Sequence, residues 1–140
     1  MDEYRFTHPV EVRYGDLDPQ GHLNNAKYLT YIEQARINYL CHLELWDGGS
    51  FMDIGIILAD AQITFRASIQ FGQPVNVGVR ISRMGNKSLT MEYRIENQDG
   101  VDVFAVGKTV LVTYDYQSGT TIPIPENWRS VITEFEGLVY

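Results

Sequence analysis

The chain has 140 residues, of which 44% are hydrophobic and 21% charged, the usual proportions of a globular domain. We therefore expect one domain spanning residues 1–140. A formal net charge of -7 opposes contact with nucleic acid phosphates and anionic membrane surfaces, so we expect neither as a partner. Cys41 is the only cysteine, which excludes an intrachain disulfide.

Targeting and cofactor motifs are missing from the sequence. Residues Met1 to Arg5 are polar and do not resemble a secretory signal, and no apolar run reaches the length of a membrane span. We expect a cytoplasmic protein. No zinc-like spacing of Cys, His and carboxylates, no glycine-rich phosphate loop and no Gly-x-Ser-x-Gly motif is present. The sequence therefore predicts no metal and no cofactor.

The first half of the chain predicts a strand, a loop and a helix. Alternation of apolar and polar residues from Val10 to Tyr14 predicts the strand. Turn-forming and helix-capping residues fill positions 16–25 and predict the loop. From about Ala26 to Leu43, apolar residues recur at steps of three and four, which predicts one long amphipathic helix.

The second half of the chain predicts strands. Alternating or continuous apolar patterns indicate strands at 61–67, 75–82, 89–96 and 103–114. The connections between the last three are short, so these strands form an antiparallel meander. Trp128, Ile132 and Phe135 predict a short closing helix with Pro125 near its start. One helix among antiparallel strands excludes a parallel βαβ array, so the fold class is α+β.

A dense motif runs from Asp16 to Arg36 and reads D-x-D-x-x-G-H-x-N-N-x-x-Y-x-x-Y-x-E-x-A-R. This motif resembles the hydroxybenzoyl-CoA thioesterase family of hotdog-fold proteins, while the rest of the chain is similar to that family only in strand order. The resemblance implies a hotdog fold, a five-stranded antiparallel sheet wrapped around one long central helix. It also implies hydrolysis of an acyl-CoA or acyl-carrier-protein thioester without metal, and a homodimer or dimer of dimers paired edge to edge, with active sites between subunits.

The resemblance assigns a catalytic carboxylate and an oxyanion donor. In hydroxybenzoyl-CoA thioesterases the second aspartate of the motif is catalytic, and it corresponds to Asp18; Asp16 takes the less critical first position. The oxyanion donor of the relatives is the backbone amide that aligns with Asn25. The chemistry agrees, because thiolate leaves readily and a carboxylate can attack the thioester or activate water. Free N–H groups of a helix's first turn stabilise the developing oxyanion.

The residues around Asp18 have a structural interpretation beside the catalytic one. Plant acyl-carrier-protein thioesterases of this fold use Asp, Asn and His at steps of two; Asp18 and His22 match, but Gln20 replaces the asparagine. His22 can orient Asp18, position water or protonate the leaving group. Alternatively, His22, Asn24 and Asn25 cap the helix, and an aspartate before a helix also stabilises it. Asn24 is a candidate for both capping and substrate binding.

Three further residues are candidates for substrate binding. Tyr28 has a motif position that favours the acyl pocket, although aromatic residues at helical spacing are more often core. The relatives hold the phosphates of coenzyme A with basic residues near one hairpin, which makes Arg83 and Lys87 candidates; solvated surface charges are the alternative. Glu33 and Arg36, one helical turn apart, are expected to form a structural ion pair.

Two other functions of the fold compete with hydrolysis. A non-catalytic hotdog module would bind acyl-CoA, but it would not need the Asp18 carboxylate facing a thioester carbonyl. A hydratase fits less well, because those relatives carry a different motif with their histidine on the helix. The acyl chain, the choice between coenzyme A and a carrier protein, and the choice between nucleophile and base for Asp18 stay open.

Overall fold

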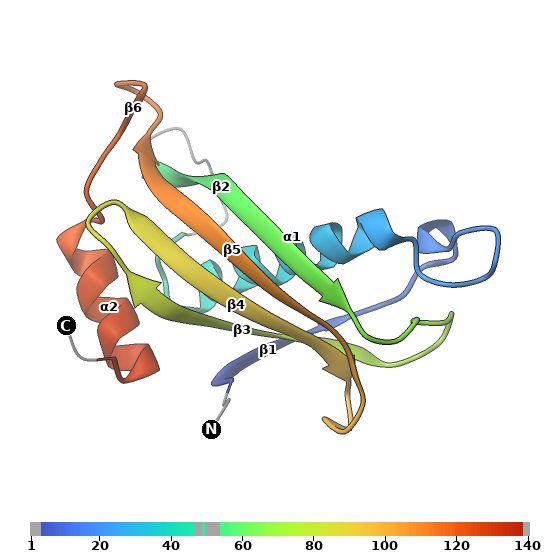
Figure 1. Ribbon diagram of the computed structural model, residues 1–140. Coiled ribbons are helices and arrows are strands. Elements are labelled where there is room, and N and C mark those ends of the chain that lie inside the picture. Colours follow the sequence, from blue (N-terminus) through green and yellow to red (C-terminus); the bar gives the residue numbers. More distant parts are fainter. Residues whose placement is uncertain (1–3, 47–48, 50–53, 139–140) are drawn as a thin grey trace.

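The computed structural model of the protein describes residues 4–46, 49 and 54–138 (Figure 1). Its helices are α1 (Asn25–His42) and α2 (Glu126–Glu136). Its strands are β1 (Phe6–Val10), β2 (Ile54–Phe65), β3 (Val75–Met84), β4 (Ser88–Asn97), β5 (Val103–Asp115) and β6 (Thr120–Thr121). The strands form an antiparallel sheet of order β1-β3-β4-β5-β2, and the short β6 pairs with the end of β5.

The core lies between the sheet and the helices. Helix α1 crosses one face of the sheet (Figure 1). The aromatic residues of its apolar stripe are buried. Its buried residues are Tyr28, Tyr31, Ile32, Ala35, Arg36, Tyr39 and Leu40. Helix α2 buries Trp128 and Ile132 beside the β3–β4 hairpin. None of the helices in the described ranges is both long and apolar enough to cross a membrane.

Two of the predicted strands begin earlier than expected. The first strand is β1, Phe6–Val10, and the prediction of a strand at 10–14 is wrong. Beyond Val12 the backbone turns, because the N–H of Asp16 donates to the carbonyl of Arg13 and the Asp16 carboxylate accepts from the N–H of Arg13. Strand β2 begins at Ile54, and an irregularity between Leu58 and Asp60 interrupts the alternation that sequence patterns depend on.

The rest of the strand and helix prediction agrees closely with the structure. The antiparallel meander of β3, β4 and β5 is confirmed. The helix predicted from Ala26 to Leu43 corresponds to α1, and the closing helix is α2, with Pro125 as its N-cap residue. The two-residue β6 adds a sixth strand to the five that were predicted.

The expected ion pair between Glu33 and Arg36 does not form. Arg36 faces the sheet and is buried, and its Nη1 donates to Tyr93 Oη at 3.2 Å. Tyr93 Oη in turn bonds Thr109 Oγ1 at 2.7 Å. Glu33 is on the exposed side of the helix. A spacing of one helical turn was not enough to predict this ion pair. Arg36 is buried, and its burial offsets its attraction to the exposed carboxylate of Glu33.

The two ends of the sheet have different neighbours. At one end, Val75 of β3 pairs with Val10, and Gln70 pairs with His22 of the 16–24 loop. At the other end, the β3–β4 hairpin contacts α2 and the segment before it, since the N–H of Ile124 donates to the carbonyl of Asn86 at 2.9 Å. Strand β3 joins these ends and spans about 26 Å between residues 75 and 83, at ~3.3 Å per residue.

Candidate active site

The loop that precedes α1 is closed by its own backbone hydrogen bonds. At its base, the N–H of Asn24 donates to the carbonyl of Asp16 at 2.9 Å. Nearer its tip, the N–H of Asp18 donates to the carbonyl of His22 at 2.8 Å, and the N–H of Gly21 donates to the carbonyl of Asp18 at 3.0 Å. Gly21 has a φ of 82°, a left-handed conformation that favours glycine. The loop is therefore a fixed support for the side chain at position 18.

One oxygen of the Asp18 carboxylate supports this loop. Asp18 Oδ1 accepts hydrogen bonds from the N–H groups of Gln20 at 2.9 Å and His22 at 3.1 Å. In the part of the chain that the structure describes, Oδ2 of Asp18 accepts none. The same carboxylate therefore has one oxygen that fixes the turn and one that is available to a substrate.

The start of α1 supplies a free hydrogen-bond donor. Asn24 is the N-cap residue, and its side-chain oxygen accepts from the N–H of Ala26 at 3.0 Å. The N–H of Lys27 donates to the carbonyl of Asn24 at 2.8 Å. No acceptor among the described residues bonds the N–H of Asn25. This amide is at the positive end of the helix dipole and is suited to bind developing negative charge.

A cleft of about 300 Å³ brings these groups together. It is lined by Asp18, His22, Leu23, Asn25, Tyr28, Phe65, Arg66, Ala67 and Ser68. Four of the residues predicted from the motif are thus side by side in space: Asp18, His22, Asn25 and Tyr28. The structure places a carboxylate and the opening turn of the long helix on the walls of one cleft.

Tyr28 forms part of the floor of the cleft. Its side chain is only 2% exposed and meets the Phe65 ring edge to face, with 4.9 Å between ring centroids. Burial raises the pKa of Tyr28, so its hydroxyl group is neutral around pH 7. Tyr28 is therefore both a core residue and a neutral aromatic wall of the cleft.

The opposite wall, residues 65–68, was not singled out as a unit from the sequence. It begins at the last residue of β2, and it is held in place by the N–H groups of Arg66 and Ala67, which both donate to the carbonyl of Phe104. The next residues are tied to the motif loop, since the N–H of Leu23 donates to the carbonyl of Ile69 at 2.7 Å. Arg66 brings a cation to the cleft. The pairing of distant segments, which no local pattern reveals, creates this wall.

Three of the predicted substrate-binding residues do not line the cleft. Asn24 is exposed and caps α1. Arg83 and Lys87 are at the β3–β4 hairpin, at the other end of the sheet, and Lys87 Nζ donates to Thr121 Oγ1 at 3.4 Å. A ligand in the cleft of one chain is therefore distant from the hairpin of that chain. Within the described ranges, no group of three or more Cys, His, Asp or Glu residues is arranged to hold a metal ion.

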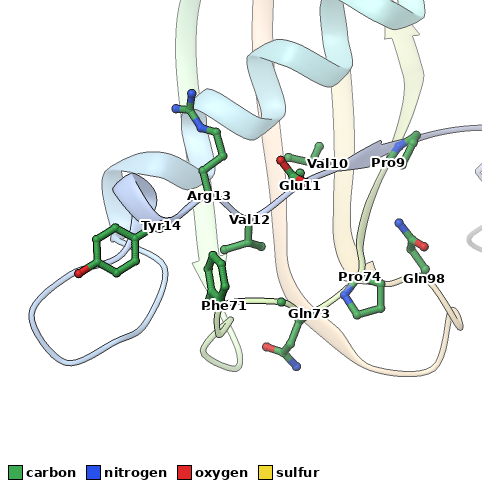
Figure 2. Close-up of a pocket in the computed structure, with 11 residues that line it drawn as sticks. Pro9, Val10, Glu11, Val12, Arg13, Tyr14, Phe71, Gln73, Pro74 and Gln98 are labelled. Atoms are coloured by element: carbon green, nitrogen blue, oxygen red, sulfur yellow. The ribbon is translucent and has the colours of Figure 1, made fainter.

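A larger hollow, of about 710 Å³, lies between residues 9–14 and 71–74 (Figure 2). Its charged lining residues are Glu11 and Arg13. In Figure 2 the Arg13 side chain extends away from Phe71 and Gln73. Its guanidinium group pairs with the Asp16 carboxylate at 3.2 Å. Neither Asp18 nor the opening turn of α1 lines this hollow. The smaller cleft at Asp18 is therefore the better candidate for chemistry.

Comparisons with known proteins find relatives that match most of the chain. The sequence profile described as the thioesterase-like superfamily matches residues 12–132. A thioesterase from Thermus thermophilus, solved with coenzyme A and Zn, is 34% identical, with a TM-score of 0.83 over 99% of this chain and 100% of that one. A thioesterase superfamily protein from Jannaschia sp. CCS1 is 26% identical, with a TM-score of 0.87 over 99% of this chain and 87% of that one. The 1,4-dihydroxy-2-naphthoyl-CoA hydrolase of Synechocystis sp. is 23% identical over 94% of this chain and 96% of its own length.

Proposed function

Because this chain belongs to the thioesterase-like superfamily and is a thioester hydrolase, we propose that it hydrolyses acyl-CoA thioesters with Asp18 as the catalytic carboxylate and the Asn25 amide as oxyanion donor. The proposal rests on two polar groups at one cleft that lack hydrogen-bond partners among the described residues. Asp18 Oδ2 and the N–H of Asn25 have no partner among the described residues, and both residues line the cleft.

The reaction has two routes that use the same groups. As a general base, Asp18 takes a proton from water, and the hydroxide attacks the thioester carbonyl. As a nucleophile, Asp18 attacks that carbon and expels the thiolate, and water then cleaves the resulting anhydride to the free acid and the carboxylate. In both routes the carbonyl oxygen becomes negative, and the Asn25 amide and the helix dipole stabilise it. His22 returns a proton to the departing thiolate or orients the attacking water.

A binding module without activity is the alternative. A carboxylate oxygen that faces a carbonyl oxygen repels it, so a site made for binding alone gains nothing from Asp18. A site made for hydrolysis does gain, because the carboxylate acts on the carbonyl carbon while the amide binds the oxygen. The arrangement of Asp18 and Asn25 therefore favours the enzyme.

The walls of the cleft indicate where the parts of the substrate lie. We assign the acyl group to the aromatic side of the cleft, at Tyr28 and Phe65. The exposed Arg66 is suited to the anionic coenzyme at the opening. We also take α1 to be the central helix of a hotdog fold, around which the sheet curves.

Self-association would complete the coenzyme site. Strand β2 is a long edge strand of the sheet and exposes Ile57, Leu58 and Phe65 at 38%, 47% and 47% of their surface. Unpaired backbone groups and apolar side chains on one edge favour pairing with a second copy of the chain. In such a homodimer or dimer of dimers, the basic hairpin with Arg83 and Lys87 contacts the coenzyme in the cleft of another subunit.

A hydrolysis screen tests the proposed function. Purified protein is incubated with acyl-CoA thioesters of short, long and aromatic acyl groups, and with an acyl-carrier-protein thioester, while free thiol is measured. We expect release of coenzyme A from at least one group of acyl-CoA thioesters. Tight binding of these thioesters without any release of thiol would instead establish the non-catalytic module.

A further inference from the structure

The first aspartate of the motif is buried and has no place in the chemistry proposed above. Asp16 is 1% exposed and does not line the cleft. Its Oδ2 accepts hydrogen bonds from Tyr31 Oη at 2.8 Å and from the N–H of Arg13 at 3.1 Å, and its Oδ1 accepts from Arg13 Nη2 at 3.2 Å. A buried carboxylate with three donors requires a structural explanation.

Asp16 is the base of the loop that carries Asp18. Its carbonyl accepts the N–H of Asn24, which closes the loop, and Asp18 follows two residues later. The other backbone bonds of the loop are internal, go to the connection after β2, join its first residues to Arg13 and Tyr14, or join Asn24 to the first turn of α1. Among the described residues, the bond from Tyr31 to Asp16 is the one side-chain hydrogen bond between this loop and α1 beyond its first turn. It therefore couples the loop to the body of the helix.

The bond between Tyr31 and Asp16 keeps its charge-assisted form across the neutral pH range. Burial alone raises the pKa of Asp16, but hydrogen bonds from Arg13 and Tyr31 outweigh it and hold that pKa below the ordinary aspartate value. Burial, and then the hydrogen bond to Asp16, raise the pKa of Tyr31. A phenol therefore donates to a carboxylate, and both residues are largely buried.

We propose that Asp16 and Tyr31 form a clamp that positions the Asp18 carboxylate against the opening turn of α1, an inference that rests on the function proposed above. Both are positioning residues and contact no substrate. The Asn25 amide is fixed to the helix, whereas Asp18 is fixed to the loop. The clamp sets the distance between them, and a displacement of about 1 Å is enough to slow a reaction ~100-fold.

Kinetics of two variants test the clamp. We expect Asp16→Asn to lower kcat about 10- to 100-fold and to leave KM within about threefold, since neither the acyl wall nor the coenzyme contacts change. Tyr31→Phe lowers kcat in the same direction. The double variant loses less than the product of the two separate losses, because both changes act on one hydrogen bond: Asn removes the charge of its acceptor and Phe removes its donor. The matched control is Tyr93→Phe, which removes a buried hydroxyl group that bonds Thr109 and Arg36 and no residue of the loop.

Amide hydrogen exchange tests the clamp without any substrate. The N–H groups of Gln20 and His22 report the Asp18 turn, because both donate to its Oδ1. We expect them to exchange about tenfold faster in Asp16→Asn and Tyr31→Phe than in the wild type, and unchanged in Tyr93→Phe. The clamp is overturned if exchange at these amides and kcat are the same in all three variants as in the wild type while their unfolding temperatures are lower. Asp16 and Tyr31 would then only stabilise the fold.

The two proposals fail in different ways. If Asp18→Asn hydrolyses thioesters like the wild type while Asp16→Asn still accelerates exchange at Gln20 and His22, the proposed function is wrong and the clamp is right. If Asp18→Asn is inactive and exchange at these amides does not respond to Asp16→Asn or Tyr31→Phe, the function stands and the clamp is wrong.

Discussion

The two ends of the sheet use polar groups in opposite ways. At the β3–β4 hairpin, Glu136 of α2 is buried, and its carboxylate accepts from Tyr39 Oη and from the N–H of Ile81 at 3.0 Å. Arg129 donates to the carbonyl of Gly85 at 2.8 Å in the same region. At the 16–24 loop, by contrast, a carboxylate oxygen of Asp18 and the N–H of Asn25 are left without partners among the described residues.

This difference separates a scaffold from a site. Folding favours structures in which buried polar groups find partners, and the carboxylate of Glu136 follows that rule. A cleft for chemistry needs donors and acceptors that the protein itself does not satisfy, because the substrate must bind them. The hydrogen bonds of a carboxylate in this fold therefore indicate its role better than its burial does.

The largest expected effect distinguishes the carboxylate of Asp18 from that of Glu136. Asp18→Asn should lower kcat about 100- to 10,000-fold, because the amide neither attacks nor takes a proton. Its unfolding temperature should hardly change, since the asparagine keeps an oxygen for the N–H groups of Gln20 and His22. Glu136→Gln should do the reverse, with kcat of the folded protein within twofold of wild type and stability lowered by about 1–3 kcal/mol.

Steady-state hydrolysis and urea unfolding of the two proteins measure both effects. Two results would contradict the distinction between the loop end and the hairpin end of the sheet. One is loss of activity in fully folded Glu136→Gln, and the other is wild-type activity in Asp18→Asn.

A smaller effect is expected for the histidine of the cleft. His22→Gln should lower kcat about 10- to 100-fold, at the lower end of general acid–base contributions, because proton delivery to the thiolate is slowed. The control is His8→Gln, since His8 is in β1 opposite Val77 and away from the cleft. Steady-state hydrolysis by the two variants measures the effect. Equal kcat values in His22→Gln and His8→Gln would show that His22 only supports the loop.

If the hairpin of a second copy of the chain contacts the coenzyme, changes at Arg83 and Lys87 should weaken coenzyme binding. The double change Arg83→Gln and Lys87→Gln should raise KM for acyl-CoA about three- to tenfold and leave kcat unchanged, as expected for a few exposed charges. Higher salt should reduce the difference in KM between this double variant and the wild type. Lys108→Gln, another exposed cation, is the control. A KM that is the same in all three proteins would make Arg83 and Lys87 ordinary surface charges.

The smallest effect concerns stability in acid. Because the pKa of Asp16 is below its ordinary value, the unfolded chain binds more protons than the folded protein below about pH 4. The contribution of Asp16 to stability is thus present above that pH and is lost as the pH falls through the folded pKa. Urea unfolding between pH 5 and 2.5 should show a smaller loss of stability in Asp16→Asn than in wild type. Identical slopes would contradict the pKa assignment.

Local patterns predicted the elements well and the site only in part. Val75 to Met84 alternates along β3, and the stripe of α1 follows helical spacing, so both could be identified from the sequence. Asp18, His22, Asn25 and Tyr28 came from one continuous motif, and the same continuity brings them to one cleft.

The missing parts of the prediction depend on contacts between distant segments. The wall at Arg66 exists because the connection after β2 bonds Phe104 and the motif loop. Strand β1 was misplaced because the apolar alternation continues to Tyr14, whereas the pairing of β1 with β3 ends at Val10. The separation of Arg83 from the cleft within one chain follows from the length of β3, which only the topology shows.

The proposed hydrolysis at this cleft depends most on the convergence of Asp18 and the Asn25 amide on one carbonyl group. An acyl-CoA analogue with a methylene group in place of the thioester sulfur keeps the carbonyl and cannot be hydrolysed. Titration of this ketone into ¹⁵N-labelled protein should shift the amide proton of Asn25 downfield more than any other amide of α1, because its carbonyl accepts that hydrogen bond. An unshifted Asn25 amide in the saturated complex would contradict the assignment of this cleft as the site of hydrolysis.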